Sequence, residues 1–191
     1  MKIYDISQEV FSSVVFPGDP APKKETLRSI SNGEICNLTA FSMCAHNGTH
    51  VDAPCHFIEG GKSVEQISLS KTVGTCYVFE RNGDISAQDA RDMLSKTNCT
   101  RILIKGRATV TNSAARVFAQ SGVDLIGNES QTVGPEDSPI EVHNILLSRD
   151  VVLLEGIRLS DVPEGEYLLN AAPLSLAGAD GAPCRAVLIK L

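Results

Sequence analysis

The sequence predicts a mixed α/β fold, and three observations lead to this prediction. Hydrophobic residues make up 42% of the chain and charged residues 21%, which is ordinary for a globular protein with a buried core. The first third of the chain contains several short β-rich stretches. From about residue 86 onward, short helices alternate with apolar strands, as in a mixed sheet covered by helices. A length of 191 residues fits one domain, so we expect residues 1–191 to form a single unit.

The first third is expected to consist mainly of strands. Four segments are rich in β-branched or alternating apolar residues and are flanked by turn residues, namely 2–6, 24–30, 36–45 and 74–80. The Asn32-Gly33 pair is a strong hairpin signal, because both residue types tolerate the positive φ of tight turns. We therefore expect a hairpin that joins the second of these segments to the third.

Two helices are expected in the middle of the chain. The first begins at Ser86, which forms a capping-box pattern with Asp89, and it runs to about Lys96. The second spans residues 112–120, and Gly122 follows closely, as a helix stop commonly does.

A third helix is predicted near residue 140. Ser138 is the expected N-cap, Pro139 the first helical residue and Glu141 the partner that completes a capping box. The helix should run to about Leu147. Apolar strands are expected between and after the helices, at 100–105, 123–127, 151–155, 167–170 and 186–191.

Three of the four histidines lie within residues 46–56. The side chains with ligand or acid–base chemistry there all have one parity: His46, His50, Asp52 and His56. In an extended chain, side chains of one parity point to one face. Gly48 and Pro54 disfavour a helix, so we expect an extended or turning segment. The stretch is therefore predicted to be an array of metal ligands.

Two further candidates lie far along the chain. His143 falls on the predicted apolar face of the third helix with Ile140, Leu146 and Leu147. Glu155 ends the apolar strand at 151–155, where a charge is costly unless something pairs with it. Taken separately, these residues also fit a buried neutral histidine and an exposed acid at a strand end. A metal would account for both of them.

The six candidates together suit a catalytic metal site. Imidazole and carboxylate ligands are typical of zinc, manganese or iron, and the absence of clustered thiolates argues against a structural four-cysteine zinc site. Three or four ligands would hold one ion, whereas six candidates also permit two ions bridged by a carboxylate. A bound metal lowers the pKa of its water toward ~7, and a histidine that is not a ligand can move protons beside it.

Composition excludes several other classes of protein. The formal net charge of −6 argues against nucleic acid as the main partner, and no apolar run is long enough to cross a membrane. The first residues contain no signal-peptide pattern, so a cytoplasmic protein is expected. The six cysteines are scattered and fit buried hydrophobic positions. Cys44 and Cys55 flank the histidines, and either of them is an alternative nucleophile.

The histidine stretch resembles a known motif. His46-x-Gly48-Thr49-His50-x-Asp52-x-Pro54-x-His56 is similar to the motif of the metal-dependent cyclase family, which includes bacterial arylformamidases and isatin hydrolase. Segments at both ends of the chain are similar to this family too, namely 5–7, 16–19 and 181–186. In effect the resemblance covers the whole chain.

The resemblance implies a role for each candidate. His46, His50 and Asp52 would bind one metal, and Asp52, His143 and Glu155 would bind a second, with Asp52 bridging. His56 would be the general base and acid. The metal would be zinc, one or two ions, or manganese. The implied fold is a β-barrel-like or mixed sheet with peripheral helices, of the swivelling β/β/α type, and the chain would form a homodimer or homotetramer.

The implied reaction is hydrolysis of a small amide. An aryl formamide such as N-formylkynurenine, an intermediate of tryptophan catabolism, is the expected substrate. Arylformamidases usually have Trp before the Pro-Gly-Asp segment, whereas this chain has Phe16 there as its candidate substrate-binding residue and contains no Trp. A cyclic amide or lactone, as in isatin hydrolase, is the alternative substrate. A non-catalytic metal-binding protein and a cysteine hydrolase are the alternatives of other classes.

Overall fold

A nine-stranded mixed sheet forms the centre of the computed structural model, which describes residues 1–190. The strand order is β1-β13-β11-β5-β7-β9-β10-β4-β12. The bounds are β1 Lys2–Asp5, β4 His50–Asp52, β5 Val73–Glu80, β7 Arg101–Lys105, β9 Leu125–Asn128, β10 Val152–Glu155, β11 Gly165–Asn170, β12 Gly181–Pro183 and β13 Val187–Lys190. The mixed α/β fold with a sheet core and peripheral helices is confirmed.

The middle of the sheet is parallel and both edges are antiparallel. Strands β5, β7, β9 and β10 run parallel to one another, and they are joined by helical connections. Residues 101–104 of β7 are buried, as are all residues of β9 and β10, because both faces of this part of the sheet are covered. Strand β4 pairs antiparallel with β10 and with β12.

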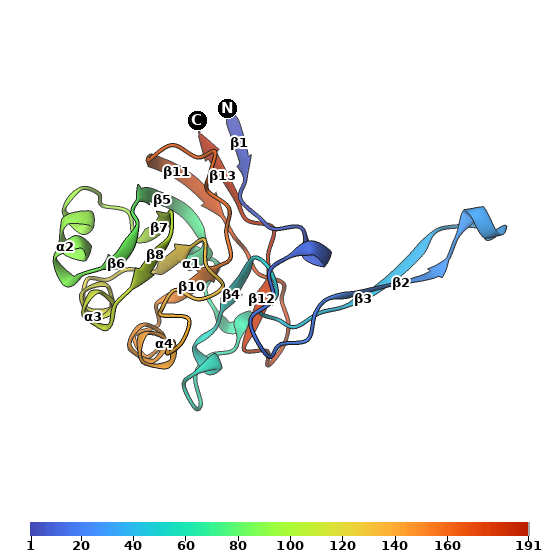
Figure 1. Cartoon of the computed structure of the whole chain (residues 1–191), viewed down its shortest axis with the longest axis horizontal. Helices are drawn as coiled ribbons and strands as arrows, with labels where there is room; N and C mark the ends of the chain where they lie inside the picture. The colour runs from blue at the N-terminus through green and yellow to red at the C-terminus, as the bar shows by residue number, and fades with distance from the viewer. Residues whose placement is uncertain (191) are drawn as a thin grey trace.

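Three helices cover one face of the sheet. They are α2 Ala87–Ser95, α3 Asn112–Gln120 and α4 Ile140–Leu147, and Figure 1 shows them grouped on one side of the molecule. Phe79, Met93 and Phe118 are fully buried in the core between this face and the helices. A second core on the other side of the sheet contains Val51, Leu154 and Leu188. The sheet is therefore buried between two apolar layers.

The first two predicted helices are confirmed, and so is the capping box that starts the first of them. Ser86 and Asp89 form the predicted capping box at the start of α2, and α3 has the predicted bounds, with Thr111 as its N-cap. These ends depend on neighbouring residues alone, so the local sequence is sufficient to predict them.

The predicted start of the third helix is wrong. Pro139 is the N-cap of α4 and makes no side-chain cap, whereas the Ser138 hydroxyl bonds to Asp137 instead. Ile140 is 61% exposed and so does not lie on the buried face, although His143 and Leu146 do. Proline has no N–H and fixes φ, and these properties allow the helix to begin without a capping side chain.

A hairpin projects from the body of the protein. Strands β2 Lys23–Arg28 and β3 Leu38–Ser42 pair antiparallel and are joined through a 3₁₀ turn at Ile30–Asn32, which confirms the predicted hairpin. All residues of β2 are exposed. Figure 1 shows this hairpin extending well away from the rest of the chain. Local sequence does not predict this projection.

Several short elements have little sequence signal. They are α1 Leu69–Thr72, the paired strands β6 Gly83–Ile85 and β8 Ala108–Val110, strand β12, and further 3₁₀ turns at Val10–Ser12, Pro54–His56 and Val64–Gln66. Among residues 1–190, no helix is long and apolar enough to cross a membrane.

Candidate metal centre

Strand β4 places two of the candidate ligands. His50 lies opposite Glu155 of β10, and Asp52 lies opposite Leu153 of the same strand. His50 and Asp52 share one face of β4, while Val51 between them points into the apolar core. The side chains of His50, Asp52 and Glu155 are almost completely buried, with at most 3% exposed. Three ionisable groups are thus held together away from water.

His46 and His56 reach the same place from either end of β4. His46 lies in a turn that precedes the strand, and His56 ends the 3₁₀ turn Pro54–His56 that follows it. Residues 46–56 are thus extended only at 50–52 and turn on either side, in agreement with the predicted extended or turning segment. Chain reversals, rather than strand parity, turn His46 and His56 toward the centre, and their rings stack with centroids 4.0 Å apart.

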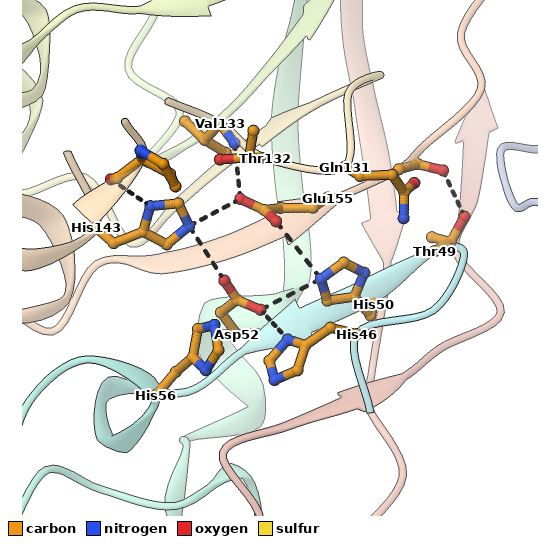
Figure 2. A network of polar contacts seen from close by, with 12 residues as sticks. His46, Thr49, His50, Asp52, His56, Gln131, Thr132, Val133, His143 and Glu155 are labelled. Carbon is orange, nitrogen blue, oxygen red and sulfur yellow. Dashed lines mark hydrogen bonds and ion pairs between the residues drawn. The ribbon is translucent and has the colours of Figure 1, made fainter. Parts of the chain in front are cut away.

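Asp52 is the centre of the cluster, as Figure 2 shows. Its Oδ1 lies 2.8 Å from His46 Nδ1 and 3.3 Å from His50 Nε2, and its Oδ2 lies 3.5 Å from His143 Nε2. Glu155 closes the far side, with His143 Nε2 3.2 Å from Oε1 and His50 Nε2 3.5 Å from Oε2. His143 comes from α4 and so joins a distant segment to the site.

Three overlapping groups of side chains have the geometry to hold a metal ion. They are His46, His50 and Asp52; Asp52, His143 and Glu155; and His46, His56 and Asp180; in each group the ligand atoms lie within 4.8 Å of one another. The first two are the sets that the family resemblance implied, and Asp52 belongs to both of them, which suits a bridging carboxylate. The third lies on the outer, more exposed side of the cluster.

Backbone contacts fix the orientation of the two buried histidines. His50 Nδ1 lies 3.1 Å from the carbonyl oxygen of Gly48, and His143 Nδ1 lies 2.8 Å from that of Pro139. A carbonyl oxygen only accepts, so both Nδ1 atoms donate. Each ring therefore presents Nε2 to the cluster, which is the usual arrangement of a histidine ligand. The Val133 N–H donates to Glu155 Oε1 at 2.7 Å and orients that carboxylate.

The buried carboxylates of the cluster favour positive charge around them. Burial by itself lowers the pKa of His50, but hydrogen bonding to Asp52 and Glu155 outweighs it and raises the pKa to about 10. The same opposing effects raise the pKa of His143 to about 10. Burial raises the pKa of Asp52, but its contacts with His143, His46 and His50 lower it well below the usual range. The carboxylates of Asp52 and Glu155 thus stabilise positive charge beside them, which the protonated rings of His50 and His143 can provide.

The residues present fit a divalent cation. Asp52 Oδ2 is buried and has no hydrogen-bond partner among the described residues, which is costly for a charged oxygen unless a cation completes its surroundings. Nitrogen and carboxylate donors without thiolates match zinc or manganese.

Asp180 is a site residue that the sequence analysis missed. Its Oδ2 lies 3.1 Å from His46 Nε2 and 3.1 Å from His56 Nδ1. It directly precedes β12, which pairs with β4, so sheet pairing brings it to the histidines. The family-like segment 181–186 begins one residue after it, and an acidic residue beside that segment was the available signal.

Phe16 stands apart from the ligands. It lines a groove of about 1720 Å³ together with Gln131, Gly134 and Pro135, and the six candidate ligand and acid–base residues are not among the described residues that line this groove. The groove borders the segment whose Val133 N–H binds Glu155. The role of Phe16 in substrate binding stays a prediction.

The two cysteines near the histidines make contacts outside the ligand groups. Cys44 Sγ lies 3.7 Å from Asp19 Oδ2, and Cys55 Sγ lies 3.6 Å from the carbonyl oxygen of Ala179. Burial and the neighbouring Asp180 raise the pKa of the Cys55 thiol, which disfavours the thiolate that a nucleophile needs. The arrangement thus favours metal chemistry over a cysteine hydrolase.

Comparison with known proteins identifies the family. Residues 4–103 match the family described as Putative cyclase. The kynurenine formamidase of Erythrobacter litoralis is 32% identical over 204 aligned residues that cover 100% of this chain and 94% of the relative. The chain belongs to this cyclase family. The kynurenine formamidase of Sphingopyxis alaskensis is 33% identical, with 98% of this chain and 97% of the relative covered.

Solved structures agree with this assignment of the cyclase family. A potential metal-dependent hydrolase with cyclase activity superposes with a TM-score of 0.82 at 30% identity, covering 98% of this chain and 96% of its own. Isatin hydrolase A from Labrenzia aggregata superposes with a TM-score of 0.85 at 19% identity, covering 98% and 93%, and this similarity concerns the fold alone. With the curated relatives, the prediction of a hydrolase that acts on a non-peptide carbon–nitrogen bond is confirmed at the level of the class.

Proposed function

We propose that this member of the cyclase family is a metal-dependent hydrolase of a small amide, with an aryl formamide such as N-formylkynurenine as its substrate. The observation that carries the proposal is the convergence of His46, His50, Asp52, His143 and Glu155 on one buried centre, with His56 beside it. The full-length relatives named kynurenine formamidase support the choice of substrate class.

We assign the two ligand groups to one or two ions of zinc, or of manganese. His46, His50 and Asp52 would hold one ion, and Asp52, His143 and Glu155 the other. A bound divalent metal supplies a water molecule acidic enough to attack near neutral pH, and it polarises a carbonyl group. The buried carboxylates of Asp52 and Glu155 would keep the surroundings of the ion anionic.

His56 is the proposed general base and acid. Its side chain is 26% exposed, so it can reach a substrate, whereas the side chains of His50, Asp52, His143 and Glu155 are at most 3% exposed. Burial lowers the pKa of His56, so its ring is neutral near pH 7 and can accept a proton. It would take a proton from water as the amide carbonyl carbon is attacked. It would then return that proton to the nitrogen as the carbon–nitrogen bond breaks.

An assay of metal-loaded protein on several substrates tests this function. N-formylkynurenine and formanilide should be hydrolysed, and His56→Ala should lower kcat by at least ~100-fold while zinc content remains unchanged. Hydrolysis of isatin or a lactone but not of a formamide would make the cyclic substrate correct. Protein that binds zinc and is inert toward the whole panel would support a metal-binding role instead. Loss of zinc from His56→Ala would show that His56 is a ligand.

A homo-oligomer is part of the proposal. The projecting hairpin exposes several large apolar side chains, namely Leu27, Ile30, Ile35, Leu38 and Phe41, which are 43–97% exposed. An isolated two-stranded hairpin is only marginally stable in water. Packing against a second copy of the chain would cover these side chains and support the hairpin, as a homodimer or homotetramer requires.

Light scattering of the purified protein tests the assembly. Wild-type protein should have the mass of a dimer or tetramer at micromolar concentration. The double variant Leu38→Ser/Phe41→Ser should dissociate, whereas Leu174→Ser, which removes an exposed apolar side chain elsewhere, should not. A monomeric wild-type protein would contradict the proposal.

A further inference from the structure

One carboxylate oxygen connects the two most exposed histidines of the site. Oδ2 of Asp180 lies 3.1 Å from Nε2 of His46 and 3.1 Å from Nδ1 of His56. The two rings stack with an interplanar angle of 25°, so both nitrogens face the same oxygen. Asp180 is 49% exposed and holds the outer side of the cluster, opposite Asp52.

This geometry fixes which nitrogen of each ring donates to Asp180. A carboxylate oxygen only accepts, so Nε2 of His46 and Nδ1 of His56 both carry hydrogens. Nδ1 of His46 lies 2.8 Å from the Asp52 carboxylate and also donates there, and a cation held by this ligand group would take the place of that hydrogen. Asp180 would then hold the hydrogen on Nε2 of His46 while Nδ1 coordinates. Nε2 of His56 is left free to accept a proton.

The backbone around Asp180 is built for this contact. The carbonyl oxygen of Asp180 accepts a hydrogen bond from the Ala53 N–H at 2.9 Å, which ties it to the chain directly after β4. A side chain on the next residue, Gly181, would lie 2.7 Å from Cε1 of His46 and 2.8 Å from the carbonyl oxygen of Val51. Only glycine allows β12 to approach His46 this closely, so Gly181 lets the preceding Asp180 reach the histidines.

We propose that Asp180 is a positioning residue that sets the tautomers of the metal ligand His46 and of the proton-transferring His56 through one oxygen. This inference rests on the function proposed above and adds a residue to its machinery. Asp180 touches neither substrate nor metal in this assignment. It links metal binding to proton transfer, because a single side chain orients both the ligand His46 and the base His56.

Loss of this carboxylate should therefore impair two properties at once. In Asp180→Ala we expect zinc affinity to fall about 10- to 100-fold, the usual effect of removing a group that orients a histidine ligand. At saturating zinc, kcat should fall by a similar factor while KM stays close to that of wild type. Asp180→Asn keeps an oxygen that can accept from both rings, so it should recover most of both properties.

Histidine tautomers give the decisive readout. Protein labelled with ¹⁵N-histidine and loaded with zinc should show His56 in the Nδ1–H form by long-range ¹H–¹⁵N correlation. Asp180→Ala should lose this form, and Asp180→Asn should keep it. Competition with a chelator of known zinc affinity measures binding independently of turnover. Asp161→Ala, which removes an exposed carboxylate elsewhere, is the matched control and should change none of these properties.

The outcomes separate this inference from the proposed function. Unchanged tautomers and unchanged zinc affinity in Asp180→Ala would overturn the positioning role. Loss of a whole zinc equivalent in both variants would also overturn it, since Asp180 would then be a ligand. Wild-type protein that hydrolyses no amide, combined with the expected tautomer change, would refute the function and leave the positioning role intact. If Asp180→Ala fails to fold, Asp180→Asn decides the question. Loss of the Nδ1–H form of His56 in that variant would overturn the role of Asp180 as an accepting oxygen.

Discussion

His50 of β4 and Glu155 of β10 lie directly opposite each other in an antiparallel strand pair, and their side chains approach to 3.5 Å. Residues far apart in the sequence thereby become neighbours in one buried site. The family match at residues 4–103 includes His50 but neither His143 nor Glu155. The pairing of β4 with β10 therefore brings Glu155 next to His50 and Asp52, and so places the two ligand groups side by side.

The two ligand groups should be separable by mutation. His143→Ala removes a ligand from the group with Glu155 and leaves the group of His46 and His50 intact. His46→Ala does the reverse. If both groups bind metal, each variant should lose one zinc equivalent and keep the other, as measured by elemental analysis after dialysis. A replacement of Asp52 by Asn should weaken both, because that carboxylate belongs to both groups.

Asp84→Asn, which changes an exposed carboxylate on β6, is the control for this series. Wild-type protein that holds one zinc would show that a single ion is shared. If His46→Ala and His143→Ala each abolish all binding, the assignment to two separate groups is wrong.

Zinc binding should release protons at neutral pH. Without metal, the opposing effects of burial and of the Asp52 and Glu155 contacts leave the pKa of both His50 and His143 at about 10, so both rings are charged near pH 7.5. A ligand nitrogen must be free of its proton. Binding should therefore release about two protons from these rings, and affinity should rise with pH. Calorimetry in buffers of different ionisation enthalpy measures the number released.

The same protons make the stability of the metal-free protein depend on pH. The folded pKa of these histidines, about 10, lies above the ordinary value of 6.5. Their contribution to stability is thus complete below pH ~6.5 and is lost as pH rises toward ~10. Urea unfolding of chelator-treated protein should show this loss between those values, and zinc should abolish it. Zinc binding without proton release would contradict the electrostatic description of the cluster.

The sequence predicts much of the fold and most of the site, for identifiable reasons. The prediction of α3 is correct because the ends of this helix depend on adjacent residues. The predicted N-cap of α4 at Ser138 is wrong, because the helix begins after Pro139 without any side-chain cap. The ligand residues from His46 to Asp52 are apparent from their spacing and residue types. Their placement by strand parity fails at His46, because a turn places that ring.

Asp180 shows what sequence alone could not supply. It reaches His56 through the pairing of β12 with β4, and strand order across a mixed sheet is not encoded in any local pattern. The projection of the β2–β3 hairpin is equally invisible in sequence. Its residues predict a hairpin correctly, but they do not show that the two strands leave the body with every residue of β2 exposed.

Thr49 should stabilise the fold from inside the histidine stretch. It is buried beside His50. Its hydroxyl donates to the carbonyl oxygen of Gly156 at 2.8 Å, and its Oγ1 accepts from the Gln8 N–H at 2.9 Å. Thr49→Val keeps the shape but leaves the Gln8 N–H without its acceptor, whereas the Gly156 carbonyl keeps the bond from the Gln8 side-chain amide at 2.8 Å. Each unsatisfied buried group costs about 1–3 kcal/mol, so we expect the free energy of unfolding to fall by at least ~1 kcal/mol.

Urea unfolding of the metal-free protein measures this effect without the contribution of zinc. Thr39→Val makes the same chemical change on the exposed face of β3 and should alter stability by less than ~0.5 kcal/mol. An equally small change in Thr49→Val would mean that water replaces the lost hydroxyl. In that event the Thr49 hydroxyl would not be what ties the Gln8 and Gly156 segments to the metal centre.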